Sequence, residues 1–314
     1  MSFGKTDNLI SNLSRLSAEH GLVMEQRLIE LYGLADAALS LAAEYAADGL
    51  TGYDLLAAIT PESGGLDYPS PDPDTPSALS GLVGALTGTL SAIDRAAFSV
   101  LFVAGARERG IPVVESDLFS TSGGEESFIY SRNALADEAY DVLSQDFVDP
   151  RVRYGSGFAE CVRAVSTGEC RFCLLPLEEK GGTRLPTVAE LIYRSDLKIN
   201  AVTPVFGFDG TADLKYALLS RDFIIPALRA GDDLYLEIRL PAAGGELTPL
   251  LSVLGYLGLE PFRIDTLTYT TEGEGETCFS LVLRDAGGGF APLLCYLALF
   301  VGDFTTVGLY KNLE

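Results

Sequence analysis

The chain has 314 residues, enough for two or three domains of ordinary size. It carries 44 acidic and 22 basic residues, and this formal charge of −22 disfavours partners with phosphate backbones or anionic lipid surfaces. Hydrophobic residues make up 47% of the chain, so wholesale disorder is excluded. No apolar run reaches the roughly 20 residues of a membrane-spanning helix, and residues 1–27 lack a signal-peptide pattern. These features predict a soluble, cytoplasmic protein that binds neither nucleic acid nor membrane.

The cysteines and the single histidine argue against metal and nucleophilic chemistry. Five cysteines are an odd number in a chain without an export signal, which favours free thiols. Cys170 and Cys173 have metal or redox spacing, but they lie in an apolar run typical of a buried strand, where pleating predicts sulfurs on opposite faces. His20 is predicted at a helix end, and no nucleophile motif accompanies it. We therefore expect no metal and no cofactor.

The first part of the chain is predicted to be helical. Over residues 1–60, apolar side chains recur three and four positions apart, the period of an amphipathic helix. Residues 61–76 contain five prolines and are expected to form a linker or long surface loop. Helical periodicity resumes in the segment 77–125, and we expect this helix to pack on the α/β lobe that follows.

Residues 126–228 alternate short apolar strands with helices, which predicts a parallel sheet built from right-handed crossovers. The expected strands are 128–131, 152–154, 172–177, 199–206 and 215–219, with the first three buried, and the expected helices are 135–144, 158–165 and 187–193.

Residues 229–314 have the clearest order of elements. The pattern predicts strand 233–240, helix 246–256, strands 262–270 and 277–284, helix 290–301 and strand 305–310. This is the order of the ferredoxin-like βαββαβ unit, a four-stranded antiparallel sheet with two helices on one face. The expected fold class is therefore α/β and α+β: a helical region, a single α/β lobe and a ferredoxin-like unit.

Two segments resemble the bacterial prephenate dehydratases, which join a two-lobed α/β catalytic domain to a C-terminal ACT domain. Residues 158–178 end in Pro176-Leu177-Glu178 and are similar to the family's helix and strand ending in Pro-Ile-Glu-Asn-Ser, while residues 197–203 resemble the family's next strand. Residues 244–247 and 265–268 are similar to the ACT motifs Pro-Gly-Ala-Leu and Glu-Ser-Arg-Pro. The resemblance covers roughly residues 127–314. It implies a periplasmic-binding-protein-like lobe, an ACT domain and a link to phenylalanine biosynthesis.

The departures from the family concern its catalytic groups. Leu214-Lys215-Tyr216 stands where the family has Thr-Arg-Phe, so the hydroxyl that assists dehydration is replaced by an aliphatic side chain. Lys215 could still attract an anion without the bidentate fork of arginine, and Thr211 could supply a hydroxyl only if the alignment slips by three residues. Residues 208–213 are too few to form the family's second lobe. Half of the family's substrate cleft is therefore expected to be missing.

The resemblance also implies a ligand site and a homodimer, because ACT domains pair and bind amino acids at their edges. The matching positions are Gly244, Gly245, Glu246, Leu247, Asp265 and Thr266. A glycine before a helix exposes backbone N–H groups suited to a carboxylate, and a nearby aspartate could hold an α-ammonium group. The alternative interpretation is an ordinary turn and an exposed strand end.

Two weaker signals remain. Nine of the 22 basic residues lie between positions 132 and 198, which makes an anion site possible, although ordinary solvated charges are an alternative. The candidates are Arg132, Arg153, Arg163, Lys180 and Arg184, and residues 178–180 are expected to form a surface turn. Residues 90–95 and 107–114 faintly resemble a chorismate mutase, but that family's helix-borne arginine would fall near Ala104. An amphipathic packing helix is the alternative.

Three functional hypotheses follow. The first is a non-catalytic, dimeric relative of the prephenate dehydratases that binds an aromatic amino acid or a similar carboxylate. The second is a diverged but active dehydratase that converts prephenate to phenylpyruvate. The third is a dimeric scaffold without a ligand. An enzyme needs a proton donor beside a cation in a closed pocket, a sensor needs a pocket at a dimer interface, and a scaffold needs neither.

Overall fold

The computed structural model describes residues 3–45, 51–59, 84, 87–111, 113–114, 125–179, 181–206, 212–224, 233–271, 274–285, 289–301 and 303–313. In chain order the main elements are α1 (Phe3–Tyr45), α2 (Gly52–Ile59), α4 (Ala92–Glu108), β1 (Ser127–Tyr130), α6 (Ala134–Leu143), β2 (Arg151–Tyr154), α7 (Phe158–Ser166), β3 (Phe172–Glu179), α8 (Pro186–Arg194), β4 (Lys198–Phe206), β5 (Ala212–Ser220), β6 (Leu234–Pro241), the 3₁₀ turn η1 (Ala242–Gly244), α9 (Leu247–Leu257), β7 (Glu260–Thr271), β8 (Glu274–Arg284), α10 (Ala291–Phe300) and β9 (Thr305–Asn312). The expected linker at 61–76 lies outside the described residues. Within those residues, none of the helices combines the length and apolar character that a membrane crossing requires.

The α/β part is a mixed sheet rather than the parallel one expected. Strands β2, β1 and β3 are parallel neighbours, but β5 runs antiparallel to both β3 and β4. β4 and β5 therefore form a hairpin, which agrees with the prediction that no second lobe fits between them. Helix α6 covers one face through Ala136 and Ala139, and helices α7 and α8 cover the other through Val162 and Ile192.

The C-terminal part has the expected ferredoxin-like arrangement, and the α/β and α+β fold class is confirmed. Its strands lie in the order β9-β6-β8-β7, and every neighbouring pair is antiparallel. Alternation along β6 sends Leu236, Ile238 and Leu240 toward the core that contains α9 and α10. Glu237 and Arg239 consequently point to the opposite face, which the unit's own helices leave uncovered.

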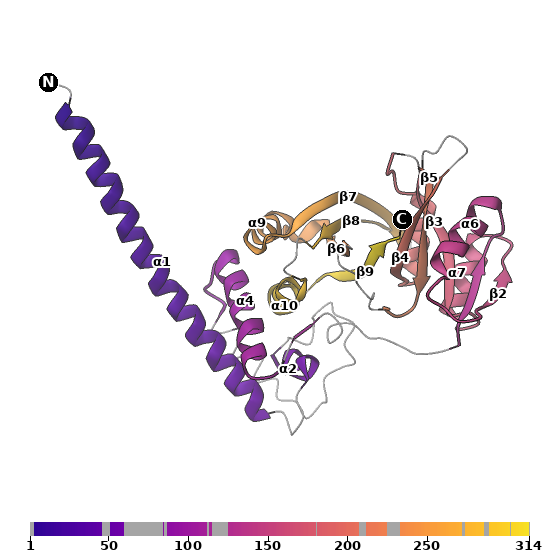
Figure 1. Cartoon of the computed structure of the whole chain (residues 1–314), viewed down its shortest axis with the longest axis horizontal. Helices are drawn as coiled ribbons and strands as arrows, with labels where there is room; N and C mark the ends of the chain where they lie inside the picture. Colours follow the sequence, from indigo (N-terminus) through magenta and orange to yellow (C-terminus); the bar gives the residue numbers. More distant parts are fainter. Residues whose placement is uncertain are drawn as a thin grey trace.

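The two sheets join into one sheet of nine strands, because β4 pairs in parallel with β9. Figure 1 shows the curved sheet running from β7 to β2, with the helical region at the end that carries α9 and α10. At the junction Gly308 of β9 lies opposite both Ile199 of β4 and Glu237 of β6. The faces of the α/β part and the ferredoxin-like unit are thereby continuous.

The N-terminal helices form a layer over the ferredoxin-like unit. The second half of α1 packs along α4, where Leu31 and Leu39 share a core with Phe98 and Phe102, and α4 in turn lies on α9 and α10. The prediction that this helix packs on the α/β lobe is therefore wrong. Helix α1 also continues through His20, so the predicted helix end there is wrong as well.

Two further local predictions fail. Strand β2, expected to be buried, is exposed at every residue because it is the outer strand of the sheet. Cys170 precedes β3 and does not alternate with Cys173, so both lie in one buried core together with Cys161 of α7. Within the described part of the chain all five cysteines are free thiols and no cluster suits a metal ion.

The start of α4 provides a test of local stability. The Ser91 hydroxyl accepts a hydrogen bond from the Asp94 N–H (3.2 Å), and the Asp94 carboxylate accepts one from the Ser91 N–H (3.4 Å), forming a capping box. We expect Ser91→Ala to lower the free energy of unfolding by about 1 kcal/mol in urea denaturation. Ser252→Ala, an exposed hydroxyl within α9, is the control and should change stability by less than about 0.5 kcal/mol. Equal effects of the two substitutions would contradict a capping role.

A buried charge cluster as the candidate functional site

The cluster begins with a tight turn after β3. Gly181 and Gly182 have φ angles of 94° and 83°, a left-handed conformation that side chains disfavour. The Glu179 N–H donates to the Thr183 carbonyl (2.9 Å), and an isolated antiparallel bridge sets Arg184 beside Glu178. The turn therefore carries the Arg184 side chain inward, against the uncovered face of the ferredoxin-like unit.

Arg184 forms a buried ion pair with that face. Its Nη2 donates to Oε2 of Glu237 on β6 at 2.5 Å, and the Ser280 hydroxyl of β8 donates to Oε1 of the same carboxylate at 2.9 Å. Glu237 is fully buried and Arg184 is 8% exposed. If either residue were removed, the other charge would stay buried without its partner, which is costly. The contact between the α/β part and the ferredoxin-like unit therefore depends on both residues.

Glu178 is the second centre of the cluster. Its Oε1 accepts from Nη1 of Arg263 on β7 at 2.5 Å and lies 3.7 Å from Nε of Arg184. Its Oε2 lies 3.6 Å from Nζ of Lys215, the residue opposite Glu178 on β5. Glu178 is only 5% exposed, so the prediction of a surface turn at this residue is wrong. We call Glu178, Arg184, Lys215, Glu237 and Arg263 the charge cluster.

Electrostatics keep both ends of the central pair ionised. Burial opposes the charge on Glu237, but Arg184 and Arg239 outweigh it and hold the pKa of this carboxyl below its usual range. Burial likewise opposes the charge on Arg184, and the facing Glu237 carboxylate more than compensates, which raises the arginine pKa. Neither group is therefore available to exchange protons near neutral pH, as a general acid or base would have to be.

Two stacked tyrosines extend the contact between the two parts. The rings of Tyr193 on α8 and Tyr269 on β7 lie 4.2 Å apart and almost parallel, and the Arg239 guanidinium carbon lies 5.3 Å from the first and 5.6 Å from the second. The Tyr193 hydroxyl donates to Glu276 at 2.8 Å. Burial raises the pKa of Tyr269. These contacts fix α8 on the sheet.

The cavity beside the charge cluster is small. It has a volume of about 30 Å³ and is lined by side chains of both parts, among them Glu178, Lys215, Arg263, Tyr310 and Asn312. That volume holds one or two water molecules. Lys215, the weak catalytic candidate, therefore faces a small cavity in which its partner is the Glu178 carboxylate. Thr211, the other candidate, lies outside the described residues.

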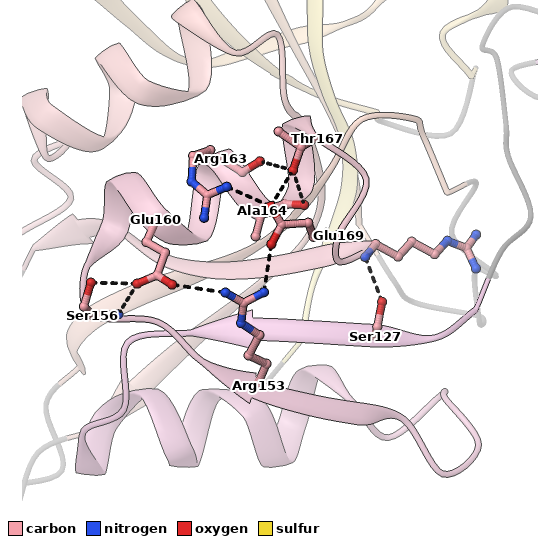
Figure 2. A network of polar contacts seen from close by, with 9 residues as sticks. Ser127, Arg153, Ser156, Glu160, Arg163, Ala164, Thr167 and Glu169 are labelled. Atoms are coloured by element: carbon pink, nitrogen blue, oxygen red, sulfur yellow. Dashed lines mark hydrogen bonds and ion pairs between the residues drawn. The ribbon is translucent and has the colours of Figure 1, made fainter.

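The predicted anion site is not assembled. Figure 2 shows Arg153 between two carboxylates, with Nη2 3.2 Å from Glu160 and Nη1 2.9 Å from Glu169. Glu169 also pairs with Arg163 at 2.7 Å, and hydrogen bonds from the two arginines lower its pKa to about 2. Arg132 pairs with an aspartate of α6 and lies over the Tyr154 ring. These arginines are occupied by the chain's own carboxylates, and Lys180 lies outside the described residues.

The predicted ligand residues lie at two separate places in one chain. Gly244 ends η1, Gly245 has a φ of 70°, and Glu246 precedes α9 without capping it through its side chain. Asp265 and Thr266 lie on β7, where Asp265 pairs with Nε of Arg263 at 2.8 Å. Pro241, just before the loop, and Leu267 both pair with Cys278 of β8, so two strand spacings, about 10 Å, separate loop and strand. One chain does not bring the two halves together.

A larger cavity lies at the amino ends of β1 and β3. It measures about 200 Å³ and is lined by residues before β1 and β3 and after β5, including Glu125, Gly168, Cys170, Arg221 and Asp222. None of the predicted site residues lines it. Because ligands in open α/β sheets bind at the carboxyl ends of parallel strands, and this cavity lies at their amino ends, the charge cluster is the stronger candidate.

No family model and no curated protein matches the chain. Among solved structures it is similar to the prephenate dehydratase of Streptococcus mutans, with 13% identity and a TM-score of 0.47 over 60% of this chain and 99% of that one. It is also similar to GqqA, described as a novel type of quorum quenching acylase, with 19% identity and a TM-score of 0.44 over 60% of this chain and 96% of that one. A third similar structure is the prephenate dehydratase of Arthrobacter aurescens in complex with L-Phe, with 13% identity and a TM-score of 0.39 over 59% of this chain and 89% of that one. At TM-scores below 0.5 these likenesses are partial and carry no argument about activity or ligand.

Proposed function

We propose that this chain is a non-catalytic, dimeric relative of the prephenate dehydratases whose ACT-like C-terminal unit binds an aromatic amino acid or a similar carboxylate. One observation carries the non-catalytic part. Lys215, at the position of the family's carboxylate-gripping arginine, lies 3.6 Å from Glu178, and Arg263 of β7 holds the same carboxylate. The sequence resemblance identifies Lys215 as the residue at the arginine position. The charge cluster explains the proposed lack of activity, because Glu178 already occupies this lysine.

The space beside Lys215 supports this proposal. Drug-sized ligands and substrates occupy pockets of about 300 Å³ or more, whereas the cavity here measures about 30 Å³. The neighbouring Leu214 has no proton to donate to a leaving hydroxyl. Arg263 and Phe262 of β7 line this cavity beside Lys215 and limit its size. A substrate could enter only if Arg263 left Glu178.

The ligand-binding part of the proposal requires a second copy. β7 is twelve residues long and lies at one end of the sheet, where a strand can pair with another chain. By resemblance to ACT domains, whose ligand sites lie between two copies, the dimer would bring the Gly244–Gly245 turn of one chain to Asp265 and Thr266 of the other. The N–H groups at the start of α9 would then receive a carboxylate, and Asp265 an ammonium group.

Binding is tested by the melting temperature of the full chain with Phe, Tyr, Trp or prephenate at millimolar concentration. We expect one of them to raise the melting temperature, since ligand at 100 times its Kd stabilises by about 2.7 kcal/mol. Thr266→Glu, which puts a negative charge at an exposed position in the middle of β7, should abolish this shift. Thr305→Glu, an exposed threonine on β9, is the control and should retain it. The absence of a shift with every ligand would contradict the proposal.

A scaffold without a ligand is the second candidate, and the pairing of Asp265 with Arg263 favours it, because the aspartate already has a cationic partner. The two candidates differ in the melting experiment: a scaffold forms the dimer but shows no shift with any amino acid.

A further inference from the structure

Residues 21–32 of α1, which reach from before the start of α4 to alongside its first turn, expose large apolar side chains. Figure 1 shows this helix projecting away from the rest of the molecule. Between residues 21 and 32 the exposed fractions are 67% for Leu22, 64% for Val23, 56% for Met24, 51% for Leu28, 68% for Ile29 and 53% for Tyr32. A helix that is apolar on most of its surface is normally buried. This segment therefore lacks its packing partner among the described residues of one chain.

Five of these side chains share one side of the helix. At 3.6 residues per turn, Met24, Leu28, Tyr32, Ile29 and Leu22 follow one another around an arc of about 160°, with the exposed Glu25 between Tyr32 and Ile29. Met24 and Leu28 continue the stripe that α1 buries in the core with α4, and Tyr32, Ile29 and Leu22 lie beside that stripe around the helix; the buried residues are Leu31, Ala35, Ala38, Leu39 and Ala42. Val23 lies outside the arc, on the opposite side. We call Leu22, Met24, Leu28, Ile29 and Tyr32 the α1 arc.

The area of the α1 arc is that of an interface. Each of its five half-exposed side chains leaves on the order of 100 Å² open, so together they expose about 500 Å². The largest apolar patch on a typical monomer is about 300 to 600 Å², and such a patch often has a function. A standard interface buries about 800 Å² on each partner, and the flanking polar side chains of α1 would supply the remainder.

We propose that the α1 arc is a dimer interface and that its occupant is the α1 arc of a second copy, with the two helices antiparallel. An exposed arc on a straight helix can pair with its own copy, because a two-fold axis perpendicular to the helix places the same residues of the two copies against each other. Antiparallel packing would place the N-terminal end of each α1 arc beside the C-terminal end of the partner's α1 arc, next to Leu31, which α4 already buries. This interface is independent of any pairing through β7 and of any ligand.

The test is sedimentation equilibrium on the full chain, whose single-chain mass is 33.5 kDa. Leu28→Glu combined with Ile29→Glu places two charges in the α1 arc. The matched control is Val23→Glu, a charge on the same helix outside the arc. All three positions are exposed in the isolated chain, so the variants should fold, and circular dichroism verifies this.

We expect the double variant to halve the mass of the assembly and to weaken self-association at least 100-fold, while Val23→Glu behaves as the unmodified chain. This result holds whether the unmodified chain forms dimers or, with β7 pairing in addition, tetramers. An unmodified chain that sediments as a single chain would overturn the proposal. So would an assembly whose mass the double variant leaves unchanged, since the interface would then lie elsewhere.

Discussion

Glu237→Gln is expected to lower the free energy of unfolding by about 3 to 5 kcal/mol, because the amide leaves the Arg184 charge buried without its partner. Glutamine keeps the size of the side chain, so packing changes little and the loss reports the charge. The 2.5 Å contact with Arg184 and the complete burial of Glu237 place this substitution among the most damaging single polar changes in the described part of the chain. Urea denaturation measures the difference.

Two matched variants separate the charge from other causes. Glu276→Gln removes an exposed carboxylate that accepts from Tyr193, and it should cost less than about 1 kcal/mol. Arg184→Met combined with Glu237→Leu removes both buried charges and should recover most of the loss, since apolar pairs often replace buried ion pairs without penalty. A cost below 1 kcal/mol for Glu237→Gln would show that the pair does not hold the two parts together.

The same pair predicts a dependence on pH. The pKa of Glu237 lies below the ordinary value of 4.5, so its contribution to stability is present above about pH 4.5 and disappears as the pH falls through the lower folded-state pKa. The difference in stability between the unmodified chain and Glu237→Gln should therefore shrink in acid. A difference that stayed constant down to pH 2 would argue against an ionised Glu237.

Gly308→Ala is expected to destabilise the chain by about 1 to 3 kcal/mol, because the junction of β4 and β9 has no room for a methyl group. A Cβ at Gly308 would lie 2.9 Å from Cβ of Ile199, which cannot move without the β4 backbone, and 2.9 Å from the Tyr310 ring. Gly255→Ala is the matched control within α9, where no atom lies within 4 Å of the added carbon. It should stabilise by up to about 1 kcal/mol, since glycine weakens a helix interior. A neutral Gly308→Ala would contradict the close contact between the two parts.

Periodicity sufficed to predict the elements. The strands and helices from residue 127 onward lie within a few residues of their expected positions, because each is short, apolar on one side and bounded by glycine or proline. The order of the last six elements fixed the ferredoxin-like topology, since few arrangements connect them without crossing. Periodicity and turn residues depend on neighbouring positions in the sequence, and so do the bounds of individual helices and strands.

The failures concern surfaces that other elements cover. Strand β6 carries Glu237 and Arg239 at alternate positions, the pattern of a strand with one solvated face, but Arg184 and α8 bury that face. Nothing in the sequence of β6 identifies its cover, which comes from more than 40 residues earlier in the chain. Likewise, the apolar Val152 and Tyr154 of β2 do not reveal that this strand is the outermost of the sheet. The charged Glu237 and Arg239 inside the otherwise apolar β6 are the sequence feature that indicates the charge cluster.

The measurement that tests the central claim most directly is conversion of prephenate to phenylpyruvate by the purified full chain, followed by phenylpyruvate absorbance, with an active prephenate dehydratase as the positive control. The charge cluster fills the region beside Lys215, and we therefore predict a rate equal to that of the uncatalysed reaction. Arg263→Ala, which removes one partner of Glu178, should not create activity, because Leu214 stands where the family has its threonine hydroxyl and has no proton to donate. Turnover by the unmodified chain that Lys215→Ala abolishes would contradict the account.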